Sequence, residues 1–298
     1  MKVLVIIVSY NFEQWMERCL GSLRLSEFPI DVLVIDNDSK DKTTELIRTQ
    51  YPEVRLIENK KNLGFGRANN IGMQIALKES YDFAFLMNQD AWIDANTIGT
   101  LVSISQKYPE YGILSPVHLT GKGDKPDPGF GDYADIQTLK ELPKSDEILP
   151  LPFINAAFWM IPTAVLKQVG GFSPLFYHYG EDKDFVNRLH FHHFKVGYVP
   201  KVFGNHDREY RPVTHAGFLR SEYVYHLSEY ANINHSGWQA FAYGILAVGK
   251  KSVQELFNGK LELSKDYLCM IFRLIAQSQM VFAQRKNNRL SHPHYIQP

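Results

Sequence analysis

Short apolar strand patterns alternate with helical patterns over the N-terminal part of the chain, and this alternation is the strongest constraint on its fold. Val3–Ser9 and Asp31–Asp36 are continuous apolar runs, which are typical of strands covered on both faces. Between them, Met16, Leu20 and Leu23 recur at helical spacing. The pattern predicts an α/β fold with a mostly parallel sheet, right-handed crossovers and flanking helices.

The later segments differ in character. Thr120–Pro152 is rich in Gly, Pro, Asp and Lys without clear periodicity, so we expect a structureless connection, either a loop that closes over substrates or a plain variable segment. From about Thr214 onward the pattern is helical and aromatic. Further strands are expected at Val54–Glu58, Phe83–Met87, Phe153–Ile161, Val196–Val199 and Val202–Phe203, and helices at Thr43–Gln50, Arg67–Lys78, Asn96–Tyr108, Pro162–Val169 and from Glu181.

Composition excludes several classes of protein. The chain has 298 residues, with 32 Lys and Arg against 32 Asp and Glu, so its net charge gives no reason to expect nucleic acid as a partner. The apolar run Val3–Val8 is too short for a signal peptide or a spanning helix, and Cys19 and Cys269 form neither a disulfide framework nor a metal pair. We expect a soluble cytoplasmic protein, with peripheral contact at the inner face of a membrane left open.

In a parallel sheet, ligands bind beyond the carboxyl ends of the strands, so the polar residues that follow each strand are the candidates for a site. Ser9 and Asn11 follow the first strand, and Asp36 and Asp38 follow the second. An acidic residue at this place accepts hydrogen bonds from a base or ribose. The alternative is a polar turn that leads into the next helix.

Two glycines and a basic residue open a helix at Asn62–Gly72. Backbone N–H groups at Gly64 and the guanidinium of Arg67 suit a phosphate group, and the alternative is a turn with a capped helix. The segment is not a dinucleotide fingerprint, because it lacks the third glycine and does not follow the first strand.

Acidic residues and a histidine follow the later strands. Asp90, with the neutral oxygen of Asn88, suits Mg²⁺ or Mn²⁺, and the alternative is an ordinary turn. Glu181 or Asp182 is a candidate general base, although acids also favour the first turn of a helix. His206 follows a strand end and is a candidate ligand or phosphate contact.

Taken in order, these segments resemble the inverting glycosyltransferases of family 2, whose nucleotide-binding half is called the GT-A fold. The resemblance spans residues 1 to about 210 and is greatest for the rhamnosyltransferase-like branch, which commonly has Asn first in its metal motif. It predicts a GT-A domain at 1–212 and a helical C-terminal extension at 213–298. The matching segments are Val8–Asn11, Val34–Asp41, Asn62–Gly72, Leu86–Asp90, Gly170–Phe172, Gly180–Asp184 and His206.

The resemblance implies the roles of the site residues. The donor is a nucleotide-diphosphate sugar, a UDP- or dTDP-sugar, whose phosphates are bridged by a divalent cation, Mg²⁺ or Mn²⁺. Asp36 corresponds to the contact with the base, with Ser9, Asn11 and Asp38 nearby. Asp90 corresponds to the metal-binding acid, Asn88 replaces its usual first partner, and His206 completes the metal or diphosphate site. Asp182 matches the catalytic base, and Glu181 is the second choice.

The implied function is transfer of a hexosyl or deoxyhexosyl group to a hydroxyl of a saccharide or lipid-linked acceptor, in cell-surface polysaccharide or glycolipid synthesis. One alternative is a sugar nucleotidyltransferase, which needs a Gly-rich basic loop after the first strand, and Ser9–Trp15 holds no Gly or basic residue. The other is a non-catalytic nucleotide-sugar-binding module, which the Asn at 88 favours and the intact Asp90 and Asp182 oppose.

Overall fold

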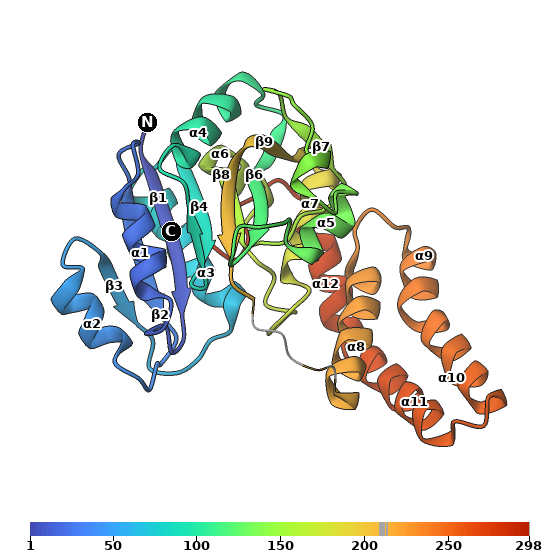
Figure 1. Cartoon of the computed structure of the whole chain (residues 1–298). Coiled ribbons are helices and arrows are strands. Elements are labelled where there is room, and N and C mark those ends of the chain that lie inside the picture. The colour runs from blue at the N-terminus through green and yellow to red at the C-terminus, as the bar shows by residue number, and fades with distance from the viewer. Residues whose placement is uncertain (209–211, 213, 298) are drawn as a thin grey trace.

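The computed structural model describes residues 1–208, 212 and 214–297, and within these residues nine strands form one sheet (Figure 1). Eight strands run in the order β3-β2-β1-β4-β8-β6-β9-β5, and β7 pairs with β9. The strands are β1 (Val3–Ser9), β2 (Asp31–Asp36), β3 (Arg55–Glu58), β4 (Phe83–Asn88), β5 (Ala91–Ile93), β6 (Tyr111–Thr120), β7 (Leu149–Leu151), β8 (Phe158–Pro162) and β9 (Lys195–His206).

The predicted α/β fold is confirmed, and parallel pairing holds for the first half of the sheet and for β6 with β9. Strands β3, β2, β1 and β4 are parallel neighbours, whereas β8 runs antiparallel to both β4 and β6. Ser9 pairs with Asp36, and Val8 pairs with Asn88, so the polar strand ends meet at one edge of the sheet. In the second half, β5 and β7 pair antiparallel with β9, which is one strand where two short ones were expected.

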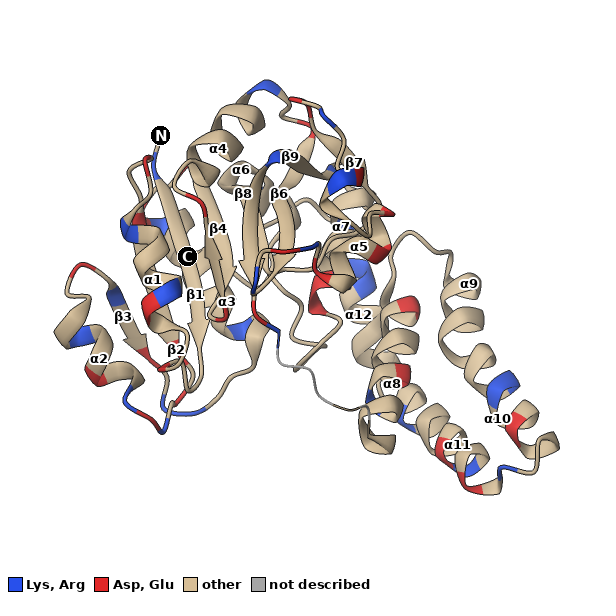
Figure 2. Ribbon diagram, in the orientation of Figure 1, with Lys and Arg blue, Asp and Glu red and all other residues tan. Residues whose placement is uncertain are grey.

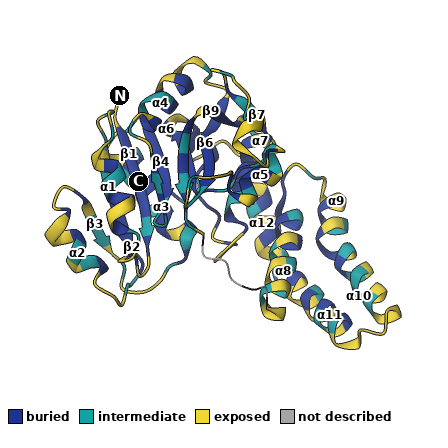
Figure 3. Ribbon diagram, viewed as in Figure 1, coloured by how far each residue is buried: buried dark blue, intermediate teal, exposed yellow. Residues whose placement is uncertain are grey.

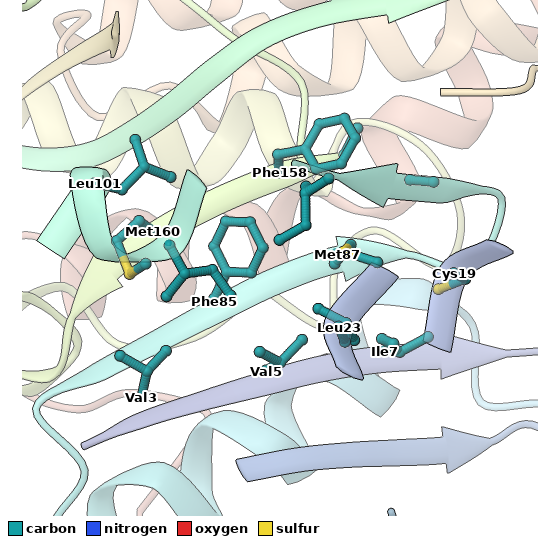
Figure 4. Packing of buried hydrophobic residues seen from close by; sticks show 14 of the residues in the cluster. Val3, Val5, Ile7, Cys19, Leu23, Phe85, Met87, Leu101, Phe158 and Met160 are labelled. Carbon is teal, nitrogen blue, oxygen red and sulfur yellow. The ribbon is translucent and has the colours of Figure 1, made fainter. Parts of the chain in front are cut away.

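Helices cover both faces of the sheet because the apolar residues of its strands alternate. On β1, Val3, Val5 and Ile7 pack against α1 (Met16–Arg24), α2 (Thr43–Gln50) and α4 (Thr97–Lys107) in one core. Leu4 and Ile6 pack in the other core, against α3 (Phe65–Lys78), α6 (Thr163–Val169) and α7 (Glu181–Phe191). Figure 4 shows part of the first core, where Cys19 and Leu23 of α1 lie over β1 and β4.

The expectation of a structureless connection at Thr120–Pro152 is wrong. This part of the chain contains α5 (Pro128–Ala134), the 3-10 turn η1 (Leu139–Glu141) and β7. Phe130 anchors α5, since its buried ring stacks on His118 at 5.2 Å and meets Tyr198 edge-on. Asp127 begins the helix by accepting a hydrogen bond from the Phe130 N–H at 3.1 Å. A few aromatic contacts therefore order a segment with little periodicity of its own.

The C-terminal helices form a projection beside the sheet (Figure 1). They have a small core of their own, which also receives Leu175 and Phe176 from the loop before α7. Most strands of the sheet are buried, whereas the helices of the projection alternate buried and exposed positions (Figure 3). The helices are α8 (His215–Ala231), α9 (Gly237–Phe241), the π-helical turn η2 (Ala242–Leu246), α10 (Ala247–Phe257), α11 (Leu261–Ala276) and α12 (Ser278–Asn288).

The last residues of the chain return to the sheet-bearing body. The Gly171 N–H donates to the His294 carbonyl at 2.8 Å, and Ile296 is buried in the core on that face. Gly170 ends α6 with a φ of 82°, and a Cβ there would meet the His294 carbonyl oxygen at 2.4 Å. The boundary between residues 212 and 213 stays a prediction. In the described part of the chain, no helix has the length and apolar character needed to cross a membrane.

Candidate active site

Two adjoining cavities lie at the carboxyl ends of the strands. The first, here called the Ser9 cavity, has a volume of about 800 Å³ and is lined by Ser9, Asn37 and Gly64 together with residues of the C-terminal helices. The second, here called the Asp182 cavity, has a volume of about 750 Å³ and contains Asp182. The residues that line both are Phe65, Asn88, Gln89, Asp90, His178 and Tyr179. One continuous space therefore runs between the end of β1 and the start of α7.

The strand ends of β1 and β2 are tied together by hydrogen bonds. Asp36 is buried, and its carboxylate accepts from the Ser9 hydroxyl at 2.9 Å, from the Ser39 N–H at 2.9 Å and from the Ser39 hydroxyl. Asn11 joins the same turn, because its side-chain oxygen accepts from the Lys40 N–H at 2.9 Å. Ser9 lines the Ser9 cavity, whereas Asp36 does not. Asp36 therefore holds the Ser9 side chain in position from behind the cavity wall.

Two further predicted contacts lie outside both cavities. Asp38 is engaged by the Lys40 ammonium at 2.6 Å, and Arg67 is exposed on α3. Gly64 does line the Ser9 cavity, and its φ of 81° and the approach of the Tyr177 carbonyl, 2.3 Å from any Cβ, require glycine. Asn37, for which no role is predicted from the sequence, lines the cavity and donates to the Gly64 carbonyl at 3.3 Å.

Asp90 and His206 meet because β5 pairs with β9, which places Ala91 opposite His206. The Asp90 Oδ1 lies 3.3 Å from the His206 Nε2, and the Asn88 Nδ2 lies 3.2 Å from the same nitrogen. Arg208 donates to the His206 Nδ1 at 3.2 Å. Behind them lies Asp127, a buried carboxylate 3.4 Å from the Arg208 Nε that the sequence analysis missed.

The Asp90–His206 pair has the donor chemistry of a divalent cation site. A carboxylate and an imidazole suit Mn²⁺, and a cation that bridges phosphates needs few protein ligands. Among the described residues, no group of three or more His, Cys, Asp or Glu side chains is arranged to hold a metal ion. The pair therefore fits a cation that takes its remaining ligands from a phosphate-bearing molecule and water.

The first turn of α7 presents two carboxyl groups to the Asp182 cavity, of which Glu181 is buried and Asp182 half-buried. Glu181 is 6% exposed, and burial together with the neighbouring Asp182 raises its pKa to about 7. Its Oε2 has no hydrogen-bond partner among the described residues. Burial also raises the pKa of Asp182, which accepts from the Lys183 N–H at 2.7 Å. Carboxylates in this state are suited to accept a proton.

Asp184, two residues after Asp182, has a different environment. It is buried against Arg188 at 2.8 Å, and that guanidinium also donates to the Val169 and Gly171 carbonyls at 2.7 Å each. Asp184 therefore fixes α7 to the end of α6. Of the three acids in this turn, Glu181 and Asp182 are the two that line the cavity.

The structure thus brings together most of the predicted site. Asn88, Asp90, Glu181, Asp182 and His206 line one cavity. Ser9 and Gly64 line the adjoining one, and Asp36, Asn11, Asp38 and Arg67 line neither. Asp90 and Asp182 converge as expected, with Asp36 one layer behind the cavity wall.

A sheet of this order, with a polar cavity at the carboxyl ends of its strands and an acidic motif at the start of α7, defines a GT-A nucleotide-sugar glycosyltransferase. A sequence model described as Glycosyl transferase family 2 matches residues 4–170, which is more than half of the chain. The chain belongs to glycosyl transferase family 2. The predicted family, fold and glycosyltransferase activity are therefore confirmed.

Similar proteins carry related descriptions. The N-acetylglucosaminyl-diphospho-decaprenol L-rhamnosyltransferase of Mycobacterium tuberculosis is 27% identical over 273 residues, covering 78% of this chain and 85% of that protein. Residues 1–349 of TarS from S. aureus superpose with a TM-score of 0.59 at 16% identity, covering 97% of this chain and 89% of that TarS fragment. GalNAc-T7, solved with UDP, GalNAc and Mn²⁺, gives a TM-score of 0.59 at 16% identity, covering 97% of this chain and 58% of its own. The two structural likenesses show a shared fold.

Proposed function

We propose that this glycosyltransferase is an inverting, cation-assisted enzyme. It transfers a hexosyl or deoxyhexosyl group from a UDP- or dTDP-sugar to a hydroxyl of a saccharide or lipid-linked acceptor, in cell-surface polysaccharide or glycolipid synthesis at the inner face of the membrane. The observation that carries the proposal is that the Asp90–His206 pair and the carboxyl groups of Glu181 and Asp182 line one cavity. The lipid-linked rhamnosyltransferase relative and a TarS structure with UDP-GlcNAc support the substrate classes.

Asp182 acts as the base. In an inverting transfer, the acceptor hydroxyl attacks the anomeric carbon from the face opposite the leaving diphosphate, and its proton must pass to a nearby group. Burial raises the pKa of the Asp182 carboxyl, which makes its ionised form a stronger proton acceptor than a solvated carboxylate. Glu181 is the second choice, because its pKa of about 7 leaves it partly protonated near neutral pH.

Asp90 and His206 would hold the cation, Mg²⁺ or Mn²⁺. A bound divalent cation neutralises the charge that develops on a departing diphosphate. His206 offers Nε2 to this site only in the tautomer with the proton on Nδ1, and that tautomer requires the Arg208 contact with Nδ1 to break. Asn88 adds no charge, so a single carboxylate leaves much of the affinity to the phosphates of the donor.

Ser9, Asn37 and Gly64 would form the wall for the nucleoside. The Ser9 hydroxyl donates to Asp36 and keeps its lone pairs for an N–H of a base or a ribose hydroxyl. Asp36 is then a positioning residue that fixes Ser9. Asn11 and Asp38 hold the adjoining turn in place through their contacts with Lys40.

The proposal is tested by binding and by product. Thermal unfolding is measured with UDP-, dTDP- and GDP-sugars, each with Mn²⁺, Mg²⁺ or EDTA. A ligand at 100 times its Kd stabilises the folded protein by about 2.7 kcal/mol, which is readily measured. The best donor is then incubated with lipid-linked and soluble saccharides, and the anomeric configuration of the product is read by NMR. A product with retained configuration, or no stabilisation by any of the three nucleotide classes, would contradict the proposal.

A further inference from the structure

The wall of the Ser9 cavity that lies away from the sheet is built by the C-terminal helices. Arg220, Tyr223 and Leu227 of α8 line it, together with Arg273 of α11 and Gln277 just after that helix. Acidic and basic residues are otherwise interspersed over the whole molecule (Figure 2). Two arginines that face one cavity are therefore a local feature of this wall and not part of a general basic surface.

The two arginines come from different helices, and Tyr223 of α8 contacts the one on α11. The Arg273 guanidinium lies over the Tyr223 ring, 4.4 Å from its centre, and this stacking holds it at the cavity wall. Arg220 is three residues before Tyr223 on the same helix, and residues at this spacing are neighbours on one helix face. Arg220 also lies near His178 on the opposite side, where its charge, after burial, lowers the pKa of that imidazole.

Neither arginine has a carboxylate partner among the residues that the structure describes. In the part of the chain that the structure describes, no carboxylate oxygen lies within 4.0 Å of the Arg220 or the Arg273 guanidinium. Arg24, Arg48, Arg55 and Arg188 each pair with an acid. Arg220 and Arg273 differ from these four in this respect and line the Ser9 cavity. Two unpaired guanidinium groups in a cavity are the arrangement that binds a diphosphate, because each can donate two parallel hydrogen bonds to its oxygens.

We propose that Arg220 and Arg273 form a subsite that binds the diphosphate group of a substrate. The inference rests on the proposed function, in which the donor and a lipid-linked acceptor both carry this group while sugars and nucleobases are neutral. The subsite takes the place predicted for Arg67, which lines neither cavity. It also makes the C-terminal helices part of the substrate site.

The test compares two diphosphates with a control that lacks phosphate. Binding of UDP, farnesyl diphosphate and uridine is measured by calorimetry for the wild type, Arg220→Gln, Arg273→Gln and Arg273→Lys. Loss of a charged hydrogen bond should weaken diphosphate binding by about tenfold, with uridine unaffected. Arg273→Lys should keep part of the affinity, since it keeps the charge. Lys250→Gln is the matched control, because Lys250 is exposed on α10 and lines neither cavity.

The pattern of losses identifies the source of the diphosphate. Weakened UDP binding alone assigns the subsite to the donor, and weakened farnesyl diphosphate binding alone assigns it to the acceptor. Unchanged binding of both in Arg220→Gln and Arg273→Gln, with unfolding temperatures equal to the wild type, would overturn the proposal. Stabilisation by inorganic pyrophosphate gives a readout that does not need glycosyl transfer. If it depends on the arginines while no sugar is transferred, the proposed function fails and the subsite stands.

Discussion

Carboxyl groups at two places along the same edge of the sheet are held in opposite ways. At the ends of β1 and β2, Asp36 accepts three hydrogen bonds from Ser9 and Ser39. At the start of α7, the Glu181 Oε2 has no partner among the described residues, and burial raises the pKa of both Glu181 and Asp182. A carboxylate whose oxygens are all satisfied supports the fold, whereas one buried without partners is available for chemistry.

The largest expected effect is on turnover, at the carboxyl pair that begins α7. Asp182→Asn should lower kcat by about 10²- to 10⁴-fold, because general base catalysis is lost while the shape of the cavity is kept. Donor affinity, measured by calorimetry, should stay close to the wild type. Asp132→Asn, an exposed acid on α5, is the control. Near-native kcat at saturating substrates would show that Asp182 is not the base.

The next effect concerns the cation pair. Asp90→Asn removes its one carboxylate, so we expect turnover to fall by roughly a hundredfold or more. The same variant should lose the extra thermal stabilisation that Mn²⁺ gives in the presence of UDP, and EDTA should have the same effect on the wild type. An Asp90→Asn protein that kept its Mn²⁺-dependent stabilisation would place the cation elsewhere.

The raised pKa of Glu181 predicts that the free energy of unfolding depends on pH. The pKa of Glu181 in the folded protein, about 7, lies above its ordinary value of 4.5. The contribution of this carboxyl group to the free energy of unfolding is therefore fully present below about pH 4.5 and is lost as the pH rises through 7. Glu181→Gln should therefore gain stability over the wild type between pH 5 and pH 8, by up to about 3 kcal/mol. Urea unfolding of both proteins at pH 5 and pH 8 measures this gain. If the difference in unfolding free energy between Glu181→Gln and the wild type did not change with pH, the raised pKa of Glu181 would be ruled out.

The smallest effect tests the satisfied group. Ser39→Ala removes a hydroxyl that donates to Asp36 and accepts from the Asn11 N–H at 2.9 Å. We expect a loss of about 1 kcal/mol in the free energy of unfolding, with kcat little changed, because Ser39 lines neither cavity. Urea unfolding and steady-state rates measure the two quantities. A large loss of turnover with stability intact would mean that this edge takes part in the chemistry.

Local pattern predicted the regular part of the fold. The bounds of β1, β2 and α2 agree with the prediction because each has a clear apolar period and lies between polar turns. Strand β6 was missed, since Pro116 and His118 are atypical of strands; a register shift beside Pro116 accommodates the proline, and Phe130 covers His118. These compensations depend on contacts with distant residues, which periodicity does not reveal.

Part of the site can be predicted from the rule that ligands bind beyond the carboxyl ends of parallel strands. Asp90 and His206 were found because each follows a strand, and the β5–β9 pairing then joins them. The rule predicts where the backbone lies, but it does not predict which hydrogen bonds a side chain makes. It therefore does not reveal that the Asp36 carboxylate already accepts three hydrogen bonds from Ser9 and Ser39. Asp127 and Arg220 are not predicted, because only the folded chain brings Asp127 to Arg208 and Arg220 to the Ser9 cavity.

The return of the chain end to α6 gives the projecting helices a second anchor. They leave the body after β9 and rejoin it where His294 and Ile296 pack beside Gly170 and Gly171. Such a segment is clamped at both ends, unlike a flap that swings on one hinge. The contacts of His294 and Ile296 therefore fasten to the sheet-bearing body the same run of helices that carries Arg220 and Arg273.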